Sequence, residues 1–133
     1  MGLYRTAMPI EPGASGIVKL NVADTDTAIA HRSGDVPVLS TPRIVALVEE
    51  AAIQAVAHEL PAGYTTVGSA VQLTHLAPVA EGSDITAEAV LDSIEGRRLI
   101  FKVTVNDDRG LVAAGYLTRV AVDRDRFLDK VKG

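Results

Sequence analysis

Glu49 is the acidic residue whose spacing best suits acid–base chemistry. On a helix, three aliphatic side chains flank it at positions i−4, i+4 and i+7: Val45, Ile53 and Val56. The neighbouring Glu50 has two alanines and a glutamine at the same spacings, a smaller and more polar face. Desolvation in an apolar stripe would favour the neutral acid and make the carboxylate more basic. A solvated carboxylate at the edge of the stripe agrees equally well with the spacing.

His75 is the candidate for proton transfer near neutral pH. Strand alternation places it on one face with three aliphatic residues: Val67, Val71 and Leu73. Ala77-Pro78 ends the strand directly afterwards, so the imidazole is expected near a rim. A hydrogen-bonded structural histidine is the alternative, and His31 and His58 are expected to be solvated.

Thr41 and Gly68 occupy places where chemistry and structure make similar demands. Thr41 precedes Pro42 at the expected start of a helix, where a hydroxyl can act as N-cap and proline's missing N–H costs nothing. A helix N-terminus also suits a developing negative charge, so the hydroxyl can touch a substrate carbonyl there. Gly68 lies inside an expected strand, which glycine weakens. Close approach by a ligand or another backbone explains it, and a β-bulge explains it equally well.

Composition excludes several other kinds of chemistry. The chain has no cysteine, which excludes a disulfide scaffold, a thiolate nucleophile and a cysteine-based metal site. A formal net charge of −4, with three Tyr, two Phe and no Trp, argues against nucleic acid as a partner. Three scattered histidines do not indicate a metal site, and the phosphate and dinucleotide fingerprints are absent. No metal or separate cofactor is expected.

Length and hydropathy predict one domain over residues 1–133. Residues 1–13 lack the apolar run of a secretory signal, and no segment is long and apolar enough to span a bilayer. A soluble cytoplasmic protein with no membrane partner is expected.

The elements that must position the candidate residues follow from periodicity and turn signals. A helix is predicted over 43–60, starting at Thr41-Pro42 and ended by Pro61 and Gly63. A first strand is predicted before it and four consecutive antiparallel strands after it, with a short helix at the C-terminus: 15–23, then 64–76, 84–94, 97–106 and 111–122, then 123–133. Residues 24–36 read as a short helical turn followed by an exposed loop. This order predicts an α+β fold with an antiparallel sheet wrapped around one central helix.

The helix predicts a partner. It carries one apolar stripe that contains Ile44 and Leu47, and a second stripe around Glu49 that is turned well away from the first. One stripe can pack on the chain's own sheet. The other needs cover from elsewhere, which favours a homodimer.

Three stretches carry a resemblance to a known family. They are VLSTPRIVALVEEAA, YTTVGSAVQLTHLAPVAEGSDI and GRRLIFKVTVNDDRGLVAAGYLTR. In this order and spacing, from about Val36 to Phe127, the chain resembles the hot-dog-fold thioesterases, specifically the fluoroacetyl-CoA thioesterase-like branch. The resemblance implies a hot-dog fold, a curved antiparallel sheet around a long central helix, working as a dimer that can assemble further.

The resemblance also assigns roles to residues. The family's catalytic threonine, glutamate and histidine fall on Thr41, Glu49 and His75. Its glycine near the reacting carbonyl falls on Gly68, and an arginine late in the sheet falls on Arg119, which implies that both bind substrate. The implied reaction is hydrolysis of an acyl-CoA or related acyl thioester, with coenzyme A entering only as part of the substrate. Glu49 attacks the carbonyl or activates water, two alternatives that the sequence leaves open, and His75 moves protons.

One segment departs from the family pattern. The fluoroacetyl-specific enzyme has phenylalanines before the helix as an apolar lid, whereas here the segment reads AIAHRSGDVPV and contains no aromatic residue. A thioesterase without fluoroacetyl specificity is therefore expected. The alternatives are a non-catalytic dimeric module that binds acyl-CoA or a small apolar ligand and, ranked lowest, a hydratase on the same fold, whose Asp and His spacing is missing.

Overall fold

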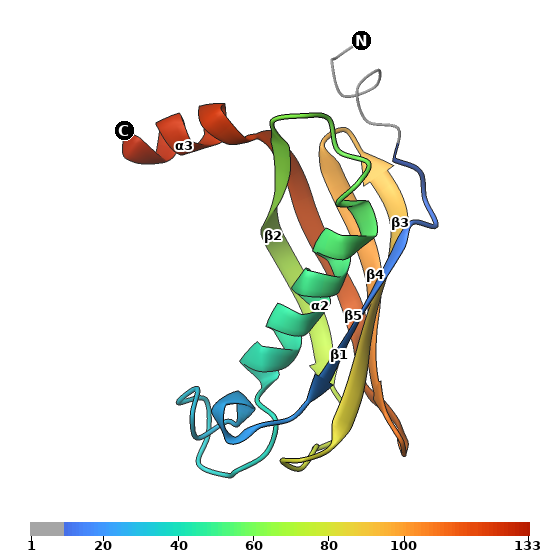
Figure 1. Cartoon of the computed structure of the whole chain (residues 1–133), viewed down its shortest axis with the longest axis vertical. Helices are drawn as coiled ribbons and strands as arrows, with labels where there is room; N and C mark the ends of the chain where they lie inside the picture. The colour runs from blue at the N-terminus through green and yellow to red at the C-terminus, as the bar shows by residue number, and fades with distance from the viewer. Residues whose placement is uncertain (1–9) are drawn as a thin grey trace.

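Five antiparallel strands form one curved sheet, and the long helix α2 lies across one face of it (Figure 1). The structure is a computed structural model, and it describes residues 10–133. The strands are β1 (Ser15–Asn21), β2 (Tyr64–His75), β3 (Asp84–Glu95), β4 (Arg98–Asp107) and β5 (Gly110–Asp123). The helices are η1 (Asp24–Asp26), α2 (Thr41–Val56) and α3 (Arg124–Lys132). The predicted α+β arrangement, a sheet wrapped around one helix, is confirmed.

The order of the strands makes β2 an edge strand. Across the sheet the order is β1-β3-β4-β5-β2, so β3, β4 and β5 follow one another while β2 pairs only with β5. A hairpin turn at 107–110 joins β4 to β5, and in it Asp107 Oδ1 accepts hydrogen bonds from the N–H groups of Arg109 and Gly110 at 2.9 and 3.1 Å. One long side of β2 therefore has no neighbouring strand among residues 10–133.

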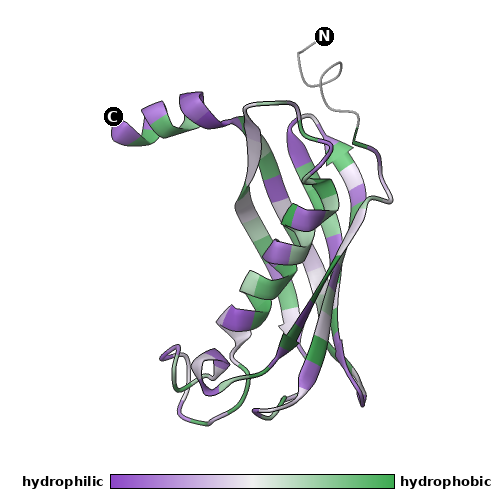
Figure 2. Ribbon diagram, viewed as in Figure 1, coloured by the Kyte–Doolittle hydropathy of each residue, from purple (hydrophilic) through white to green (hydrophobic). Residues whose placement is uncertain are grey.

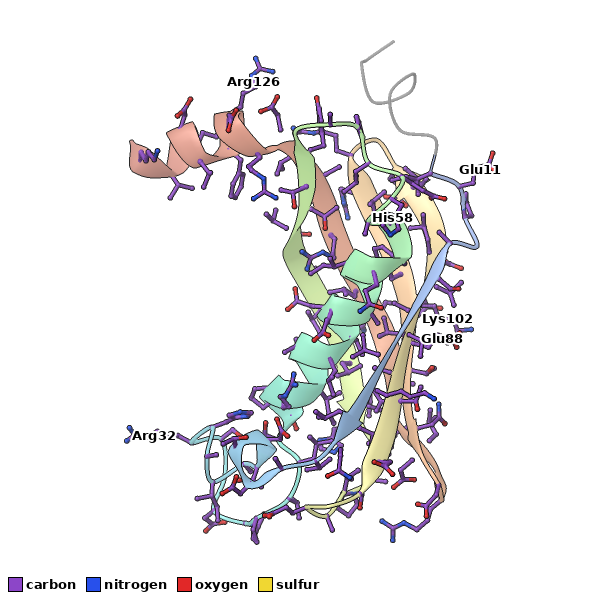
Figure 3. The ribbon with its side chains drawn as sticks, viewed as in Figure 1. Glu11, Arg32, His58, Glu88, Lys102 and Arg126 are labelled. Carbon is purple, nitrogen blue, oxygen red and sulfur yellow. The ribbon has the colours of Figure 1, made fainter. Side chains whose placement is uncertain are left out.

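The first apolar stripe of α2 packs onto the concave face of the sheet. Five of its residues are buried there: Ile44, Leu47, Val48, Ala51 and Ala52. Val56, which the spacing placed in the second stripe, is buried with them. Gly16 in β1 lets the helix come close, because a Cβ at this position would lie 2.1 Å from the carbonyl oxygen of Ala51. On the opposite face Glu88 and Lys102 point away from α2 (Figure 3). Hydrophobic and hydrophilic residues alternate along the strands (Figure 2), as expected for a sheet with one buried face. This packing holds α2, and with it Glu49, at a fixed place on the sheet.

The ends of α2 differ from the prediction. The helix begins at Thr41 itself, and its N-cap is Ser40, whose Oγ accepts a hydrogen bond from the N–H of Arg43 at 3.0 Å. The prediction that Thr41 is the cap is wrong because Thr41 already has its place in the first helical turn, with Pro42 behind it. The helix ends at Val56 rather than at Leu60. Within residues 10–133 no helix is long and apolar enough to cross a membrane.

Candidate active site

The carboxylate of Glu49 is held by a buried arginine. Arg119 Nη1 donates to Glu49 Oε2 at 2.8 Å, while its Nε and Nη2 donate to the Oγ1 and the carbonyl oxygen of Thr66 at 2.9 and 2.8 Å. The Arg119 side chain is 7% exposed and that of Glu49 32% exposed. Burial lowers the pKa of Arg119 from its ordinary value, and the charge of Glu49 opposes that shift. Glu49 therefore faces a cation, where the spacing predicted an apolar setting.

Gly68 is the place where β2 comes closest to that carboxylate. A Cβ at Gly68 would lie 2.3 Å from Glu49 Oε2 and 3.4 Å from Arg119 Nη1. No larger residue fits without moving the carboxylate. The sequence predicted approach by a ligand or another backbone, or else a β-bulge; the group that approaches is instead a side-chain carboxylate of the same chain.

A β-bulge follows Gly68 at once and decides which residues share its face. The pairing of β2 with β5 shifts between Gly68, opposite Arg119, and Ala70, opposite Thr118, so Ser69 is the extra residue. Before the bulge the even-numbered residues face α2, and after it the odd-numbered ones do. The prediction that Val67 shares a face with His75 is wrong for this reason, while Val71 and Leu73 do share it.

Thr41 and His75 meet at the start of α2. Thr41 Oγ1 and His75 Nδ1 are 2.8 Å apart and hydrogen-bonded. The Nε2 atom of His75 is buried and has no hydrogen-bond partner within residues 10–133. A hydroxyl bonded to an imidazole whose second nitrogen is unpaired is an arrangement that can pass a proton to or from a bound substrate.

A polar network fixes the N-terminus of α2 beside this pair. Ser40 Oγ contacts His31 Nδ1, so this loop histidine has a protein partner although solvation was expected. Arg43 Nε donates to Asp26 Oδ1 at 2.8 Å, and the N–H of Ala23 donates to Asp26 Oδ2 at 2.8 Å. Although burial alone raises it, the pKa of Asp26 lies below its ordinary value because of these two hydrogen bonds.

Few N–H groups at this helix terminus are available to a substrate. Pro42 has none, and those of Arg43 and Ile44 donate to Ser40 Oγ and to the Ser40 carbonyl oxygen. Within residues 10–133 the N–H of Thr41 has no acceptor. It is therefore the backbone donor left to meet a developing oxyanion.

The five predicted site residues form two groups in one chain. Glu49, Gly68 and Arg119 lie together, and Thr41 and His75 lie together. Thr41 and Glu49 are separated by two turns of α2, about 12 Å along the axis at 1.5 Å per residue. Within residues 10–133 no hydrogen bond or ion pair joins the two groups.

Sequence reasoning missed Thr66 and Ser40. Thr66 accepts hydrogen bonds from Arg119 with its side chain and its backbone. The one sequence signal for it is that it lies two residues before Gly68, and so on the same face of the strand. Ser40 precedes Thr41, and two adjacent hydroxyl residues before a proline leave the N-cap undecided. Within residues 10–133 there is no group of three or more His, Asp or Glu side chains that could hold a metal ion.

Two comparisons of the sequence with known proteins give the same family. A family model described as fluoroacetyl-CoA-specific thioesterase matches residues 22–125. The fluoroacetyl-CoA thioesterase of Streptantibioticus cattleyicolor is 34% identical over 95 residues, which are 71% of this chain and 68% of that protein.

Solved structures extend the match to the fold. A structure of the fluoroacetyl-CoA thioesterase FlK superposes with a TM-score of 0.87 at 27% identity, covering 92% of this chain and 96% of the other. A hot-dog-like protein from Thermanaerovibrio acidaminovorans superposes with a TM-score of 0.86 at 27% identity, covering 98% and 95%. The protein is thus a hot-dog-fold thioesterase that belongs to the family of fluoroacetyl-CoA-specific thioesterases.

Proposed function

We propose that the protein hydrolyses acyl-CoA thioesters with Thr41, Glu49 and His75, and that its acyl group is not fluoroacetyl. Family membership supports hydrolysis of an acyl-CoA in general. The observation that supports the residue assignment is the Thr41–His75 hydrogen bond of 2.8 Å at the start of α2, beside an N–H without an acceptor.

The reaction follows from the groups at hand. The thioester carbonyl oxygen lies at the start of α2, where the N–H and hydroxyl of Thr41 stabilise the charge that develops on it. Glu49 either attacks the carbonyl carbon, so that the C–S bond breaks and water then hydrolyses the mixed anhydride that forms, or takes a proton from the water that attacks that carbon. His75 returns a proton to the departing thiolate. Arg119 keeps the Glu49 carboxylate in one orientation.

A homodimer formed through the free edge of β2 unites the two groups. An antiparallel second copy, with the two-fold axis at Gln72 and Ser69 bulged out of the pairing, puts Gly68 of one copy opposite His75 of the other. The Glu49 carboxylate then lies near the Thr41–His75 pair across the interface, where the buried Nε2 of His75 lacks a partner. The interface also covers the second stripe of α2, of which Ile53 is 45% exposed in the single chain.

The segment before α2 supports a different acyl preference. Its residues 29–37 are exposed, and His31 is turned to Ser40 at the helix start. In this segment the chain has a histidine and small residues, whereas the fluoroacetyl-specific enzyme that it resembles has an apolar aromatic lid there. An acyl group that gains nothing from aromatic cover fits this end of the site better than fluoroacetyl.

Thiol release from a panel of short, branched and aromatic acyl-CoAs, with fluoroacetyl-CoA included, tests the proposal. Wild type should release thiol from at least one member, with fluoroacetyl-CoA not preferred. Glu49→Ala and His75→Ala should each lose about a hundredfold or more in kcat/KM, since such groups act as a set.

His58→Ala is the matched control, because this histidine is exposed at the end of α2 and should leave the rate unchanged. Equal rates for wild type and both site variants would overturn the assignment. Saturable binding of an acyl-CoA by wild type without any turnover would instead show the non-catalytic binding module.

A further inference from the structure

A groove of about 700 Å³ lies where α3 meets the ends of β2 and β5. Its floor is apolar and comes from β2 and β5: Val67, Val120 and Val122. Its walls are aromatic and charged: Tyr64, Arg97, Asp123, Arg126, Phe127 and Lys130. The size is typical of a small-molecule site, and the chemistry described above does not use this groove.

The charge of the groove is opposite to that of the whole chain. Three cationic side chains and one carboxylate line it, while the chain has a formal net charge of −4. Within residues 10–133 neither Arg126 nor Lys130 forms an ion pair. Figure 3 shows the Arg126 side chain extending away from the ribbon of α3. The positive charges of Arg126 and Lys130 are available to an anionic ligand.

The groove continues around the end of β2 toward the site. Tyr64 and Asp123 pair with each other at the end of the sheet, and by alternation they belong with Gly68 and Arg119 on the face of α2. Val67 belongs to the opposite face. A groove lined by residues of both faces wraps around this strand end, four residues from Gly68, or about 13 Å at 3.3 Å per residue.

We propose that this groove binds the phosphorylated adenosine of a coenzyme A thioester. The inference rests on the proposed function, since it names the carrier of the acyl group. Phosphate groups pair with the guanidinium and ammonium groups, and Tyr64 and Phe127 offer ring faces to the adenine base. The flexible pantetheine arm turns around the end of β2 and delivers the thioester to Glu49.

Binding of adenosine 3′,5′-bisphosphate to the full chain, measured by calorimetry, tests the groove without any turnover. The probe should bind wild type, and Arg126→Gln/Lys130→Gln should bind it at least about tenfold more weakly, because two charge-assisted contacts are lost. Arg124→Gln/Lys132→Gln is the control: it removes the same charge from the same helix at residues outside the groove, and it should bind the probe like wild type.

Kinetics on a full and a truncated substrate supply the second readout. For the groove variant, KM should rise about tenfold more for the best acyl-CoA than for the same acyl group on N-acetylcysteamine, which has no nucleotide. An increase of equal size for both substrates would overturn the inference. So would wild type that does not bind the probe, or equal binding by the groove variant and the control variant.

The two proposals fail in different ways. If no thioester is hydrolysed, the proposed function is wrong, while probe binding and its loss in the groove variant still decide whether this site exists. If thioesters are hydrolysed but the probe does not bind, the groove assignment alone is wrong. A preference for carrier-protein thioesters over CoA thioesters would be part of that second outcome.

Discussion

Ser40 and Thr41 are adjacent hydroxyl residues with different tasks. Ser40 has the extended backbone of an N-cap. Its Oγ accepts a hydrogen bond from the Arg43 N–H and contacts His31. Thr41, one residue later, does not cap the helix, and its hydroxyl is hydrogen-bonded to His75. Ser40 therefore stabilises the helix start, while the hydroxyl of Thr41 is left for the proposed chemistry.

Substituting each hydroxyl in turn separates these tasks. Ser40→Ala should lower the free energy of unfolding by about 1 kcal/mol, as loss of an N-cap does. Thr41→Ala should change stability much less, because alanine suits a helical position, but should slow thiol release by at least about tenfold. Urea unfolding and thiol release on both variants check this, and a larger stability loss for Thr41→Ala would contradict it.

At the scale of the element, the bulge in β2 allows this one strand to place two candidate site residues, Gly68 and His75, on the same face of the sheet. Gly68 and His75 are an odd number of residues apart, so a regular strand would turn them to opposite faces. The extra residue Ser69 restores both to the face of α2. One insertion thus places the close approach to Glu49 and the imidazole on the same side of the sheet.

Deletion of Ser69 should abolish thiol release, since the remaining strand can keep Gly68 or His75 on the inner face but not both. Ser69→Ala is the matched control: it keeps the residue count and loses only the 3.3 Å hydrogen bond to the Thr118 carbonyl oxygen. It should retain activity. Circular dichroism and thermal unfolding report whether the deletion variant is folded, and full activity in a folded deletion variant would refute this account of the bulge.

At the scale of the whole molecule, a dimer formed through the free edge of β2 would explain why the candidate site residues form two separate groups in one chain. Exposed residues run along the middle of β2, from Gly68 to Gln72, and α3 projects beyond this edge (Figure 1). A long unpaired strand edge is ready to pair with another chain. The proposed homodimer uses this edge and brings one copy's Glu49 to the other copy's His75.

Mixing two inactive variants tests that arrangement. A one-to-one mixture of Glu49→Ala and His75→Ala chains, refolded together, should regain about a quarter of wild-type activity, since half the dimers are mixed and each has one intact site. A site contained in one chain would regain nothing. An affinity tag on one variant verifies that mixed dimers form, and a monomer in size-exclusion chromatography would contradict the dimer itself.

The sequence by itself determined the elements and the candidate residues, because these depend on local patterns. The helix that carries Glu49 and the strands that follow it were predicted from periods of 3.6 and 2 and from turn signals. The match of three stretches to one family identified the fold and pointed to the same glutamate as the helical spacing did.

Only the tertiary structure decided how those residues are grouped. Arg119 reaches Glu49 across 70 residues of chain, the bulge at Ser69 reverses the strand alternation, and Ser40 rather than Thr41 caps the helix. These features depend on which segments meet in space and on one extra residue in a strand pairing. The periodicity of the sequence carries no information on either, because the contacts that stabilise them join elements far apart in the chain.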